Sequence, residues 1–482
     1  MAIIIVGLGP GDPAHLTREA WDVLSRSAEV YLRTTHHPTV AGLPAHLAIH
    51  SFDHLYETLA DLHSVYDAIA DEILALGRRP QGVVYAVPGH PRVVESSVTR
   101  ILAGARKEDL PVRLVEGMSF VEPVLTLLGL DGLGGLQIAD ATDLAAAHHP
   151  PLDPDRAALV GQLYGRRLAG EVKLTLMNAY PDDHPVTVVR AAGTAESSAT
   201  TLPLRKLDRG QHLDQLTTLY LPPLPHVGGL PAFQETIARL RAPDGCPWDR
   251  EQTHQTLRNN LLEETYEALA ALDAEDAGGL CAELGDLLMQ IAMHAQIATE
   301  AGEWKLPDLI GHIDAKLKRR HPHVFGDVAV SGTADVLRNW ETIKAGERAE
   351  AGEAGNSRLD GVPAILPALA RAQELGERAA RTGFDWPDVE GVLAKLGEEV
   401  DELRSAGSPE QREHELGDLL FTLANISRWL QVDGESALRS ACDRFTQRYA
   451  GMEQLAGAQG VDLASLSPAE QDALWEQAKR RE

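Results

Sequence analysis

The six residues Glu-Leu-Gly-Asp-Leu-Leu occur twice in the chain, at Glu283–Leu288 and at Glu415–Leu420. Each copy follows a segment rich in glutamate, Leu261–Asp273 in the first case and Leu396–Arg404 in the second. Both acidic segments have the apolar spacing of an amphipathic helix. The chain therefore encodes the same pair of acidic helices twice, and this duplication constrains the C-terminal half to a repeated helical fold.

Further landmarks recur around the two copies in the same order. The matched segments are Gly245–Trp248 with Gly383–Trp386, Glu263–Leu269 with Glu398–Arg404, Lys316–His321 with Arg444–Tyr449, and Asn339–Lys344 with Leu474–Lys479. After Pro231 the strand-like runs disappear. A linker-like segment rich in Ala, Gly and Glu divides this C-terminal half in two. We predict one all-α repeat over residues 232–345, a linker over 346–363 and a second all-α repeat over 364–482.

The N-terminal half alternates short β-branched runs with helical patterns, which is typical of an α/β domain. The predicted strands are Ile3–Val6, Val83–Val87, Val112–Val115, Lys173–Met177 and Val186–Arg190. The polar, proline-containing segment Ala147–Asp155 is predicted to join two lobes. We place the α/β domain at residues 1–220 and an interdomain linker at 221–231, because the prolines and glycines there cannot continue a helix or a central strand.

The bulk composition excludes several classes of protein. At 482 residues, two or three domains are expected. The net charge of −27 argues against nucleic acid or an anionic membrane surface as the main partner. Three cysteines at unrelated spacings exclude a disulfide framework and fit the reducing cytoplasm. The first residues contain a short apolar run and no basic segment, so they predict neither a signal peptide nor a membrane span.

The acidic repeat has the spacing of a metal site, because helix positions three or four apart share a face. The pairs are Glu264 with Glu267, Glu283 with Asp286, Glu399 with Glu402, and Glu415 with Asp418. Two such helices packed antiparallel would direct four carboxylates into one space. That arrangement needs a cation, and hard oxygen ligands select Mg²⁺ or Mn²⁺. Glu263 and Glu398 are candidate catalytic carboxylates, placed to orient or deprotonate a water.

A single glutamate-rich helix is most often a solvated face, and one copy alone would be interpreted so. The pairing of both motifs, their duplication and the basic and aromatic residues downstream favour the metal site. Arg320, Arg448, Lys344 and Lys479 are candidates for binding phosphate oxygens, and Trp340 and Trp475 for stacking on a base, although each tryptophan taken singly is more often part of a core.

These segments together resemble the MazG family of nucleoside triphosphate pyrophosphohydrolases over Pro231–Glu482, including Gly245–Asp249 and Arg319–Phe325. The resemblance implies an all-α, Mg²⁺-dependent homodimer that cleaves a nucleoside triphosphate to the monophosphate and pyrophosphate. In relatives with both repeats, hydrolysis is associated with the C-terminal copy. The implied metal ligands there are Glu399, Glu402, Glu415 and Asp418, with Glu399 also a catalytic candidate, and the implied substrate contacts are Lys395, Arg448, Trp475 and Lys479.

Two positions depart from the family pattern. Gln447 stands where the family has an arginine, and Asn260 of the first repeat stands where the second has Lys395. The helix pairs also carry apolar stripes that need a partner, either the other repeat or a second chain. These stripes are Leu284, Leu287, Leu288 and Ile291, and Leu416, Leu419, Leu420 and Leu423.

The N-terminal strand, glycine turn and helix resemble the tetrapyrrole (corrin/porphyrin) methylases, as do Tyr85–Val98 and Val112–Leu130. The resemblance covers about residues 1–220 and implies S-adenosylmethionine bound between two α/β lobes. The implied cofactor-binding residues are Gly7, Gly9, Pro10, Gly11, Asp12, Pro88 and Gly89. His90 and Leu32-Arg33 depart from the acidic residues usual in the family, so the tetrapyrrole substrate is expected to be lost or changed.

The joined architecture resembles YabN-type bifunctional proteins of bacteria. Three interpretations stay open. The first is a Mg²⁺-dependent pyrophosphohydrolase with a fused methylase-like domain. The second puts methyl transfer first, with the helical half as an accessory. The third makes the N-terminal domain a non-catalytic module that binds S-adenosylmethionine.

Overall fold

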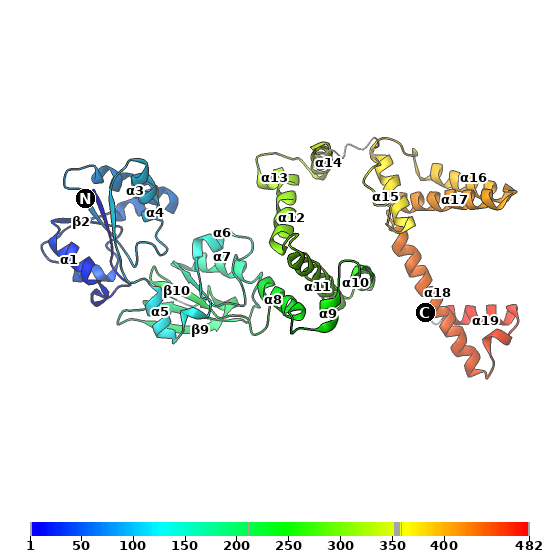
Figure 1. Ribbon diagram of the computed structural model, residues 1–482, viewed down its shortest axis with the longest axis horizontal. Helices are drawn as coiled ribbons and strands as arrows, with labels where there is room; N and C mark the ends of the chain where they lie inside the picture. The colour runs from blue at the N-terminus through cyan, green and yellow to red at the C-terminus, as the bar shows by residue number, and fades with distance from the viewer. Residues whose placement is uncertain (1, 211, 351–356, 358, 481–482) are drawn as a thin grey trace. The chain divides into compact units, whose positions relative to one another are not determined.

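The computed structural model describes residues 2–210, 212–350, 357 and 359–480, and its chain divides into two compact units, Met1–Arg250 and Glu251–Glu482 (Figure 1). The first unit contains two α/β lobes. The described residues of the second unit form helices and no strand. The predicted fold class, a two-lobed α/β domain followed by a helical region, is confirmed.

The first lobe is built on a parallel five-stranded sheet with the order β3-β2-β4-β1-β5. Its elements are β1 Ile3–Gly7, α1 Arg18–Arg26, β2 Glu29–Leu32, β3 Ala48–Ser51, α2 Asp53–Thr58, α3 Leu62–Gly77, β4 Val83–Val87, α4 Ser96–Lys107 and β5 Val112–Val115.

Successive side chains of β1 enter different cores, as the period of two along a strand requires. Ile3 and Ile5 pack with Ile69 and Ile73 of α3. Val6 packs on the opposite face with residues of α1. Because both faces are covered, the strand is apolar throughout, and its carboxyl end is directed at the edge where ligands bind in parallel sheets.

The second lobe has a mixed sheet with the order β6-β7-β10-β8-β9, in which only β6 and β7 pair in parallel. Its elements are α5 Val121–Leu128, β6 Gln137–Asp140, α6 Ala141–Ala146, β7 Ala158–Gly161, α7 Arg166–Leu176, β8 Pro185–Arg190, β9 Ser198–Pro203 and β10 Thr217–Leu221. Helices α6 and α7 cover the main core of this lobe, whereas α5 packs with Leu159 and Val189 in a separate cluster.

Two sequence-based predictions in this lobe are wrong. Lys173–Met177, predicted as a strand, is the last part of α7 and its cap. The buried residues Leu168, Val172 and Leu176 of α7 recur at the period of a helix, while Leu174 is exposed. Helical packing therefore overrides the local β propensity. The segment Ala147–Asp155 does not join the lobes, because α5 and β6 of the second lobe precede it.

The other four predicted strands are present as β1, β4, β5 and β8. Beyond β10, the segment predicted as the linker leads into α8 and is held to the second lobe. The backbone N–H groups of Gly228 and Gly229 donate to the two carboxylate oxygens of Asp155, at 2.7 and 2.9 Å. The linker is thus anchored at the point where it leaves the α/β lobes.

Helices make up the remainder of the described chain, and α8 and α9 belong mostly to the first unit. They are α8 Leu230–Arg241, α9 Pro247–Glu251, α10 Arg258–Asp273, α11 Ala277–Ala301, α12 Leu306–Arg320, α13 Pro322–Phe325, α14 Thr333–Glu350, α15 Ala368–Arg381, α16 Val389–Ser405, α17 Pro409–Trp429, α18 Gly434–Ala458 and α19 Pro468–Lys479.

Part of the predicted inter-repeat linker, at 351–356 and 358, lies outside the described residues. In the portion of the chain that the structure covers, no helix combines the length and the apolar character that a bilayer crossing requires.

Candidate active sites

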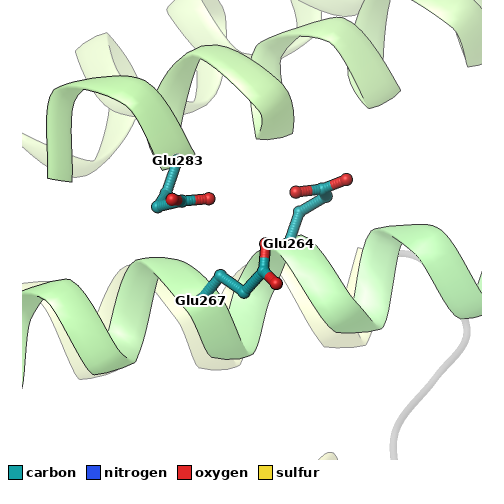
Figure 2. A group of neighbouring side chains, drawn as sticks. All are labelled: Glu264, Glu267 and Glu283. Atoms are coloured by element: carbon teal, nitrogen blue, oxygen red, sulfur yellow. The ribbon is translucent and has the colours of Figure 1, made fainter. Parts of the chain in front are cut away.

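The first carboxylate cluster lies between α10 and α11. Glu264 and Glu267 extend from α10 toward Glu283 on α11, as Figure 2 shows, and one oxygen from each of the three lies within 4.8 Å of the others. The turn between the helices is short: Glu275 adopts a positive φ of 53°, and Asp276 caps α11 by accepting the N–H groups of Gly278 and Gly279. This tight connection makes the helices antiparallel neighbours and brings the two sequence motifs together.

Burial and mutual repulsion both act on these carboxyl groups. Desolvation, followed by the charges of Asp286 and Glu267, raises the pKa of Glu264. The pKa of Glu283 is raised by the same kinds of effect, with Glu267 and Asp286 as the charged neighbours. Asp286 therefore lies close enough to act on the cluster, although it is not one of the three residues whose oxygens converge. A cation bound here would relieve the repulsion.

The second cluster repeats the geometry between α16 and α17, with Glu399 and Glu402 facing Glu415. Glu399 is only 4% exposed, and among the described residues no hydrogen-bond donor reaches its Oε2. A buried carboxylate oxygen without a donor is costly unless a cation is bound to it. Three converging carboxylates with one free buried oxygen fit a hard divalent ion such as Mg²⁺ or Mn²⁺.

The two clusters differ in one neighbour. Lys395 Nζ lies 2.9 Å from Glu399 Oε1 and 3.0 Å from Glu398 Oε1, whereas Asn260 occupies the equivalent position before the first cluster. Hydrogen bonds to Glu399 and Glu398 raise the pKa of Lys395, so its ammonium stays charged at neutral pH. The candidate catalytic residues Glu263 and Glu398 are both exposed beside their clusters.

Asp418 is the predicted ligand that stands apart from the second group of three. Its carboxylate lies 3.4 Å from His414 Nε2, one turn earlier on α17. Both Asp286 and Asp418 thus lie on the helix that carries the third glutamate but outside the set of converging oxygens. Each aspartate follows the third glutamate of its cluster by three residues and so shares the same helical face.

The basic and aromatic residues of the first repeat form a separate group on α12 and α14. The guanidinium carbon of Arg320 lies 5.4 Å from the centre of the Trp340 ring, and Lys344 Nζ lies 4.9 Å from it. Arg320 also forms an ion pair with Glu347 at 2.5 Å. Two cations thus lie within contact distance of the Trp340 ring, and Arg320 already has a carboxylate partner.

The second repeat places its basic and aromatic residues on α18 and α19. The guanidinium carbon of Arg448 lies 5.7 Å from the centre of the Trp475 ring, which also contacts Phe445 at a centroid distance of 5.3 Å. Lys479 Nζ lies 4.0 Å from Glu476. Arg448 and Trp475 are therefore grouped, Lys479 lies one helical turn after Trp475 on α19, and all three come from a different helix pair than Lys395 and the carboxylates.

A cavity of about 480 Å³ lies between the two lobes of the N-terminal unit. Three of the predicted cofactor residues, Pro10, Pro88 and Gly89, line it. Gly161, Gln162 and residues 191, 192 and 215–218 line it from the second lobe. The cavity meets the carboxyl ends of β1 and β4, which is where open α/β sheets bind their ligands.

The other predicted glycines bring backbone segments together behind the cavity. A Cβ on Gly7 would lie 2.6 Å from the Gly89 carbonyl oxygen and 2.7 Å from the Gly117 nitrogen. Gly9 has a φ of 74° and exchanges backbone hydrogen bonds with Gly89. Gly11 has a φ of 142°, and Asp12 caps the following short helix by accepting the N–H of Ala14 at 2.8 Å. These residues shape the turn that carries Pro10 into the cavity.

A buried polar chain forms part of the cavity wall. Arg33 Nη1 donates to Glu95 Oε2 at 2.8 Å, Ser97 Oγ donates to Glu95 Oε1 at 2.7 Å, and Tyr85 lies 2.8 Å from Ser97. His37, also on the wall, is 6% exposed. Burial, and then the charge of Arg33, lower the pKa of His37 to about 4, so it is neutral at pH 7.

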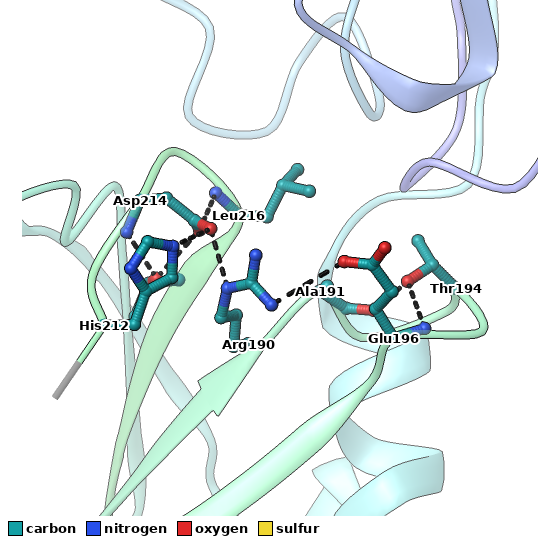
Figure 3. Close-up of polar contacts among 8 residues, drawn as sticks. Arg190, Ala191, Thr194, Glu196, His212, Asp214 and Leu216 are labelled. Atoms are coloured by element: carbon teal, nitrogen blue, oxygen red, sulfur yellow. Dashed lines mark hydrogen bonds and ion pairs between the residues drawn. The ribbon is translucent and has the colours of Figure 1, made fainter. Parts of the chain in front are cut away.

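The opposite rim is fixed by a second polar network, shown in Figure 3. Arg190 Nε donates to Asp214 Oδ2 at 2.7 Å, and the N–H of Leu216 donates to Asp214 Oδ1 at 3.0 Å. Burial alone would raise the pKa of Asp214, but the hydrogen bonds from Arg190, Leu216 and Thr217 outweigh it and lower the pKa. This network joins the end of β8 to the start of β10, the two segments that line the cavity beside residues 191 and 216.

Several cavity residues were not among the predicted sites: Arg33, His37, Tyr56, Tyr66, Glu95 and Tyr164. A signal for Arg33 was present in the sequence, because it directly follows β2 and polar residues at the carboxyl ends of parallel strands commonly bind ligands. Glu95 and the tyrosines lie within or before helices, where their positions looked like ordinary helix surface.

Comparison with known proteins agrees with both halves. The family of Tetrapyrrole (Corrin/Porphyrin) Methylases matches residues 2–208, and the MazG nucleotide pyrophosphohydrolase domain matches residues 252–325. The second match contains the first carboxylate cluster.

Relatives cover the whole chain. Uncharacterized protein YabN of Bacillus subtilis is 41% identical over 100% of this chain and 99% of its own length. Nucleoside triphosphate pyrophosphohydrolase/pyrophosphatase MazG of Thermotoga maritima is 44% identical over 51% of this chain and 95% of its own length. Nucleoside triphosphate pyrophosphohydrolase of Escherichia coli K12 is 42% identical over 51% of this chain and 95% of its own. The chain therefore belongs to the YabN-like family of proteins, in which a tetrapyrrole methylase domain is fused to a MazG nucleotide pyrophosphohydrolase region.

Proposed function

We propose that the helical half is a divalent-metal-dependent nucleoside triphosphate pyrophosphohydrolase, which converts a nucleoside triphosphate and water to the monophosphate and pyrophosphate. The observation that carries the proposal is the pair of three-carboxylate clusters, each built across an antiparallel helix pair. The names of the relatives from Thermotoga maritima and Escherichia coli support the reaction class.

In the second copy, Glu399, Glu402 and Glu415 are the proposed metal ligands, with Asp418 as a fourth. A bound Mg²⁺ supplies charge neutralisation for the triphosphate and acidity for a coordinated water. Glu398 is exposed beside this cluster and is the proposed group that orients the attacking water and takes its proton. Glu263 has the same position in the first copy, beside its proposed ligands Glu264, Glu267, Glu283 and Asp286.

The nucleotide would be held by the basic and aromatic side chains of each repeat. In the second copy, Arg448 and Lys479 are proposed to bind phosphate oxygens and Trp475 to stack on the base, with Lys395 near the metal end. Arg320, Lys344 and Trp340 have the corresponding roles in the first copy. Gln447 lacks the charge of the arginine that the family has at this position, so the second copy would bind phosphate with one cation fewer than the family pattern provides.

Product analysis tests this function. The protein is incubated with dGTP and Mg²⁺, and the products are separated by anion-exchange chromatography. We expect dGMP and pyrophosphate in equal amounts and no turnover with EDTA. Finding dGDP and inorganic phosphate as the main products would exclude a pyrophosphohydrolase.

We further propose that the interlobe cavity binds S-adenosylmethionine. The cavity contains Pro10, Pro88 and Gly89 at the carboxyl ends of β1 and β4, and the methylase family match covers the first lobe and the second lobe as far as residue 208. Calorimetry with S-adenosylhomocysteine tests binding, because the product form cannot be consumed. Saturable binding that is lost on Gly89→Val is expected, since Gly89 has a φ of 65° and borders the cavity.

Methyl transfer is the second candidate function, and a non-catalytic binding module is the third. The polar wall formed by Arg33, Glu95 and His37 favours a cavity that takes a polar ligand beside the cofactor. If the domain binds S-adenosylhomocysteine but transfers no methyl group from S-adenosylmethionine to any acceptor in a cell extract, the non-catalytic interpretation is supported.

We propose that the protein is a cytoplasmic homodimer without stable nucleic-acid binding. Large apolar side chains on α11 and α17 are exposed, including Leu284 at 51%, Leu288 at 43%, Leu416 at 48% and Leu420 at 49%. Such stripes on helices need a covering surface, and a second copy supplies an identical one. The three free cysteines agree with a reducing compartment. Analytical ultracentrifugation at two salt concentrations tests the dimer.

A further inference from the structure

We propose that Lys395 is an internal counter-ion that occupies the second carboxylate site until a nucleoside triphosphate draws it away. The two copies would then bind divalent metal differently. The first binds it without nucleotide, and the second binds it tightly only together with nucleotide. This inference rests on the proposed function, because it assumes that both clusters are metal sites.

The contacts of Lys395 carry the proposal. Its ammonium lies 2.9 Å from Glu399 Oε1 and 3.0 Å from Glu398 Oε1, so it contacts one proposed metal ligand and the proposed water-activating carboxylate together. The Glu399 side chain is 5% exposed and that of Lys395 is 34% exposed. Because Glu399 is buried, its ion pair with Lys395 is screened less than a fully exposed pair, and a dication arriving at Glu399 would meet a positive charge within contact distance.

The second oxygen of Glu399 shows that the lysine does not complete the site. Among the described residues no donor reaches Glu399 Oε2, although the residue is 4% exposed. Lysine therefore neutralises one half of a buried carboxylate and leaves the other half open. One oxygen of Glu399 contacts the Lys395 ammonium, and the other has no partner in the described part of the chain. Such a site fits a nucleoside triphosphate that arrives with a divalent metal ion and displaces the lysine.

The first copy provides the comparison within the same chain. Asn260 stands where Lys395 stands in the second copy, and an amide carries no charge. The carboxylates there face one another instead, with one oxygen each of Glu264, Glu267 and Glu283 within 4.8 Å of the others. Metal binding at the first copy relieves the repulsion between carboxylates, whereas metal binding at the second copy must displace an ammonium ion.

A nucleoside triphosphate offers the ammonium group a new partner. Its phosphate oxygens carry more negative charge than Glu399 and can be reached by the long, flexible lysine side chain. Moving Lys395 to a phosphate frees both Glu399 for the metal and Glu398 for water. Metal and nucleotide then favour each other's binding, and this coupling must be reciprocal. The device would prevent the second copy from holding an activated water before the substrate arrives.

Mn²⁺ binding to the full-length protein tests the inference without using activity. To isolate the second copy, titration calorimetry is done in a Glu267→Gln background, which weakens the first cluster. We expect Lys395→Asn in this background to tighten Mn²⁺ binding at least tenfold in the absence of nucleotide. Lys395→Arg keeps the charge and should leave binding weak. The matched change, Asn260→Lys in a Glu402→Gln background, should weaken Mn²⁺ binding at the first copy.

Nucleotide provides the second arm of the test. With a non-hydrolysable α,β-methylene triphosphate, the second copy carrying Lys395 should gain at least tenfold in Mn²⁺ affinity, and the Lys395→Asn form less than threefold. Circular dichroism checks that each variant keeps its helix content, and Lys395→Met replaces Lys395→Asn if the latter does not fold.

The outcomes separate the two proposals. If Mn²⁺ binds at both copies and its affinity changes less than twofold on Lys395→Asn, the counter-ion inference is wrong and the metal site stands. If Mn²⁺ binds at neither copy, with or without the nucleotide analogue, the metal-dependent function fails and the inference fails with it.

Discussion

Arg33 Nη1 lies 2.8 Å from Glu95 Oε2, and this buried ion pair connects the residue after β2 to the residue that precedes α4. The side chains are 18% and 2% exposed. Ser97 donates a further hydrogen bond to Glu95 and is itself bonded to Tyr85 in the core. A charged pair is thus built into the wall of the interlobe cavity and oriented by neutral groups behind it.

The first prediction concerns the loss of one member of this pair. Glu95→Gln leaves the Arg33 guanidinium buried without a counter-charge, so the free energy of unfolding of the first lobe should fall by about 3–5 kcal/mol. Hydrogen exchange measured by mass spectrometry on peptides covering β4 reports this lobe separately from the helical unit. Faster exchange of these amides is the expected sign.

The double variant Arg33→Met, Glu95→Gln is the control. It removes both charges at similar volume, so it should lose less stability than Glu95→Gln alone. If the double variant exchanges as fast as Glu95→Gln, an uncompensated charge is not the cause of the loss.

The second prediction uses the buried, neutral His37. Its pKa in the folded protein is about 4, below the unfolded value of 6.5. Between these values the unfolded chain binds more protons, so stability falls as the pH decreases from 6.5 toward 4. The full effect is about 3 kcal/mol over that window. Exchange protection of β4, corrected for the intrinsic pH dependence of exchange, measures it.

His37→Gln separates this residue from the other acid-sensitive groups near it. The variant cannot gain a proton at this position, whereas the other acid-sensitive groups nearby are the same in both proteins. The wild type should therefore lose more stability than the variant between pH 6.5 and 5. Parallel pH profiles would show that His37 is not the group responsible.

Features with a local period were predictable from the sequence. Strands β1, β4, β5 and β8 have β-branched runs, and the carboxylate pairs of both repeats have helical spacing, so each could be placed from neighbouring residues alone. The strand predicted at Lys173–Met177 shows where this reasoning fails. The buried positions of α7 extend over a longer window than five residues, and only packing against the second sheet decides between the two periods.

Features that depend on distant residues could not be predicted. Arg33 and Glu95 are 62 residues apart, and nothing in either segment indicates the other. The difference between the two carboxylate clusters is an intermediate case. The change from Lys395 to Asn260 is visible in the sequence, but the contacts of Lys395 with Glu398 and Glu399 require the rotamers of a folded helix.

The third prediction concerns the glycine turn at the end of β1. Gly7→Ala would place a Cβ 2.6 Å from the Gly89 carbonyl oxygen and 2.7 Å from the Gly117 nitrogen. Both neighbours are backbone atoms that cannot rotate away, so the cost should be about 1–3 kcal/mol or more. S-adenosylhomocysteine binding should weaken as well, because Gly89 borders the cavity.

Gly134→Ala is the matched control, since no atom lies within 4 Å of a Cβ at that position. Its exchange protection and cofactor affinity should match those of the wild type. Unchanged exchange of the β1 amides in Gly7→Ala would mean that the three glycine segments can separate without loss.

The last prediction assigns activity between the two copies. Glu402→Gln and Asp418→Asn each remove a proposed metal ligand from the second copy. Each should lower pyrophosphohydrolysis at least 100-fold, because every ligand helps to hold the ion and its water in place. The matched variants in the first copy are Glu267→Gln and Asp286→Asn, with the same chemical change on the equivalent helix faces. They should retain most activity if hydrolysis belongs to the second copy, as the family resemblance implies.

The measurement is initial-rate pyrophosphate release from dGTP over a range of Mg²⁺ concentrations. A weakened ligand should be partly rescued by high Mg²⁺, whereas a misfolded variant should not. If the first-copy variants lose activity and the second-copy variants keep it, the assignment is reversed, and Lys395 marks the copy that has become an inactive partner.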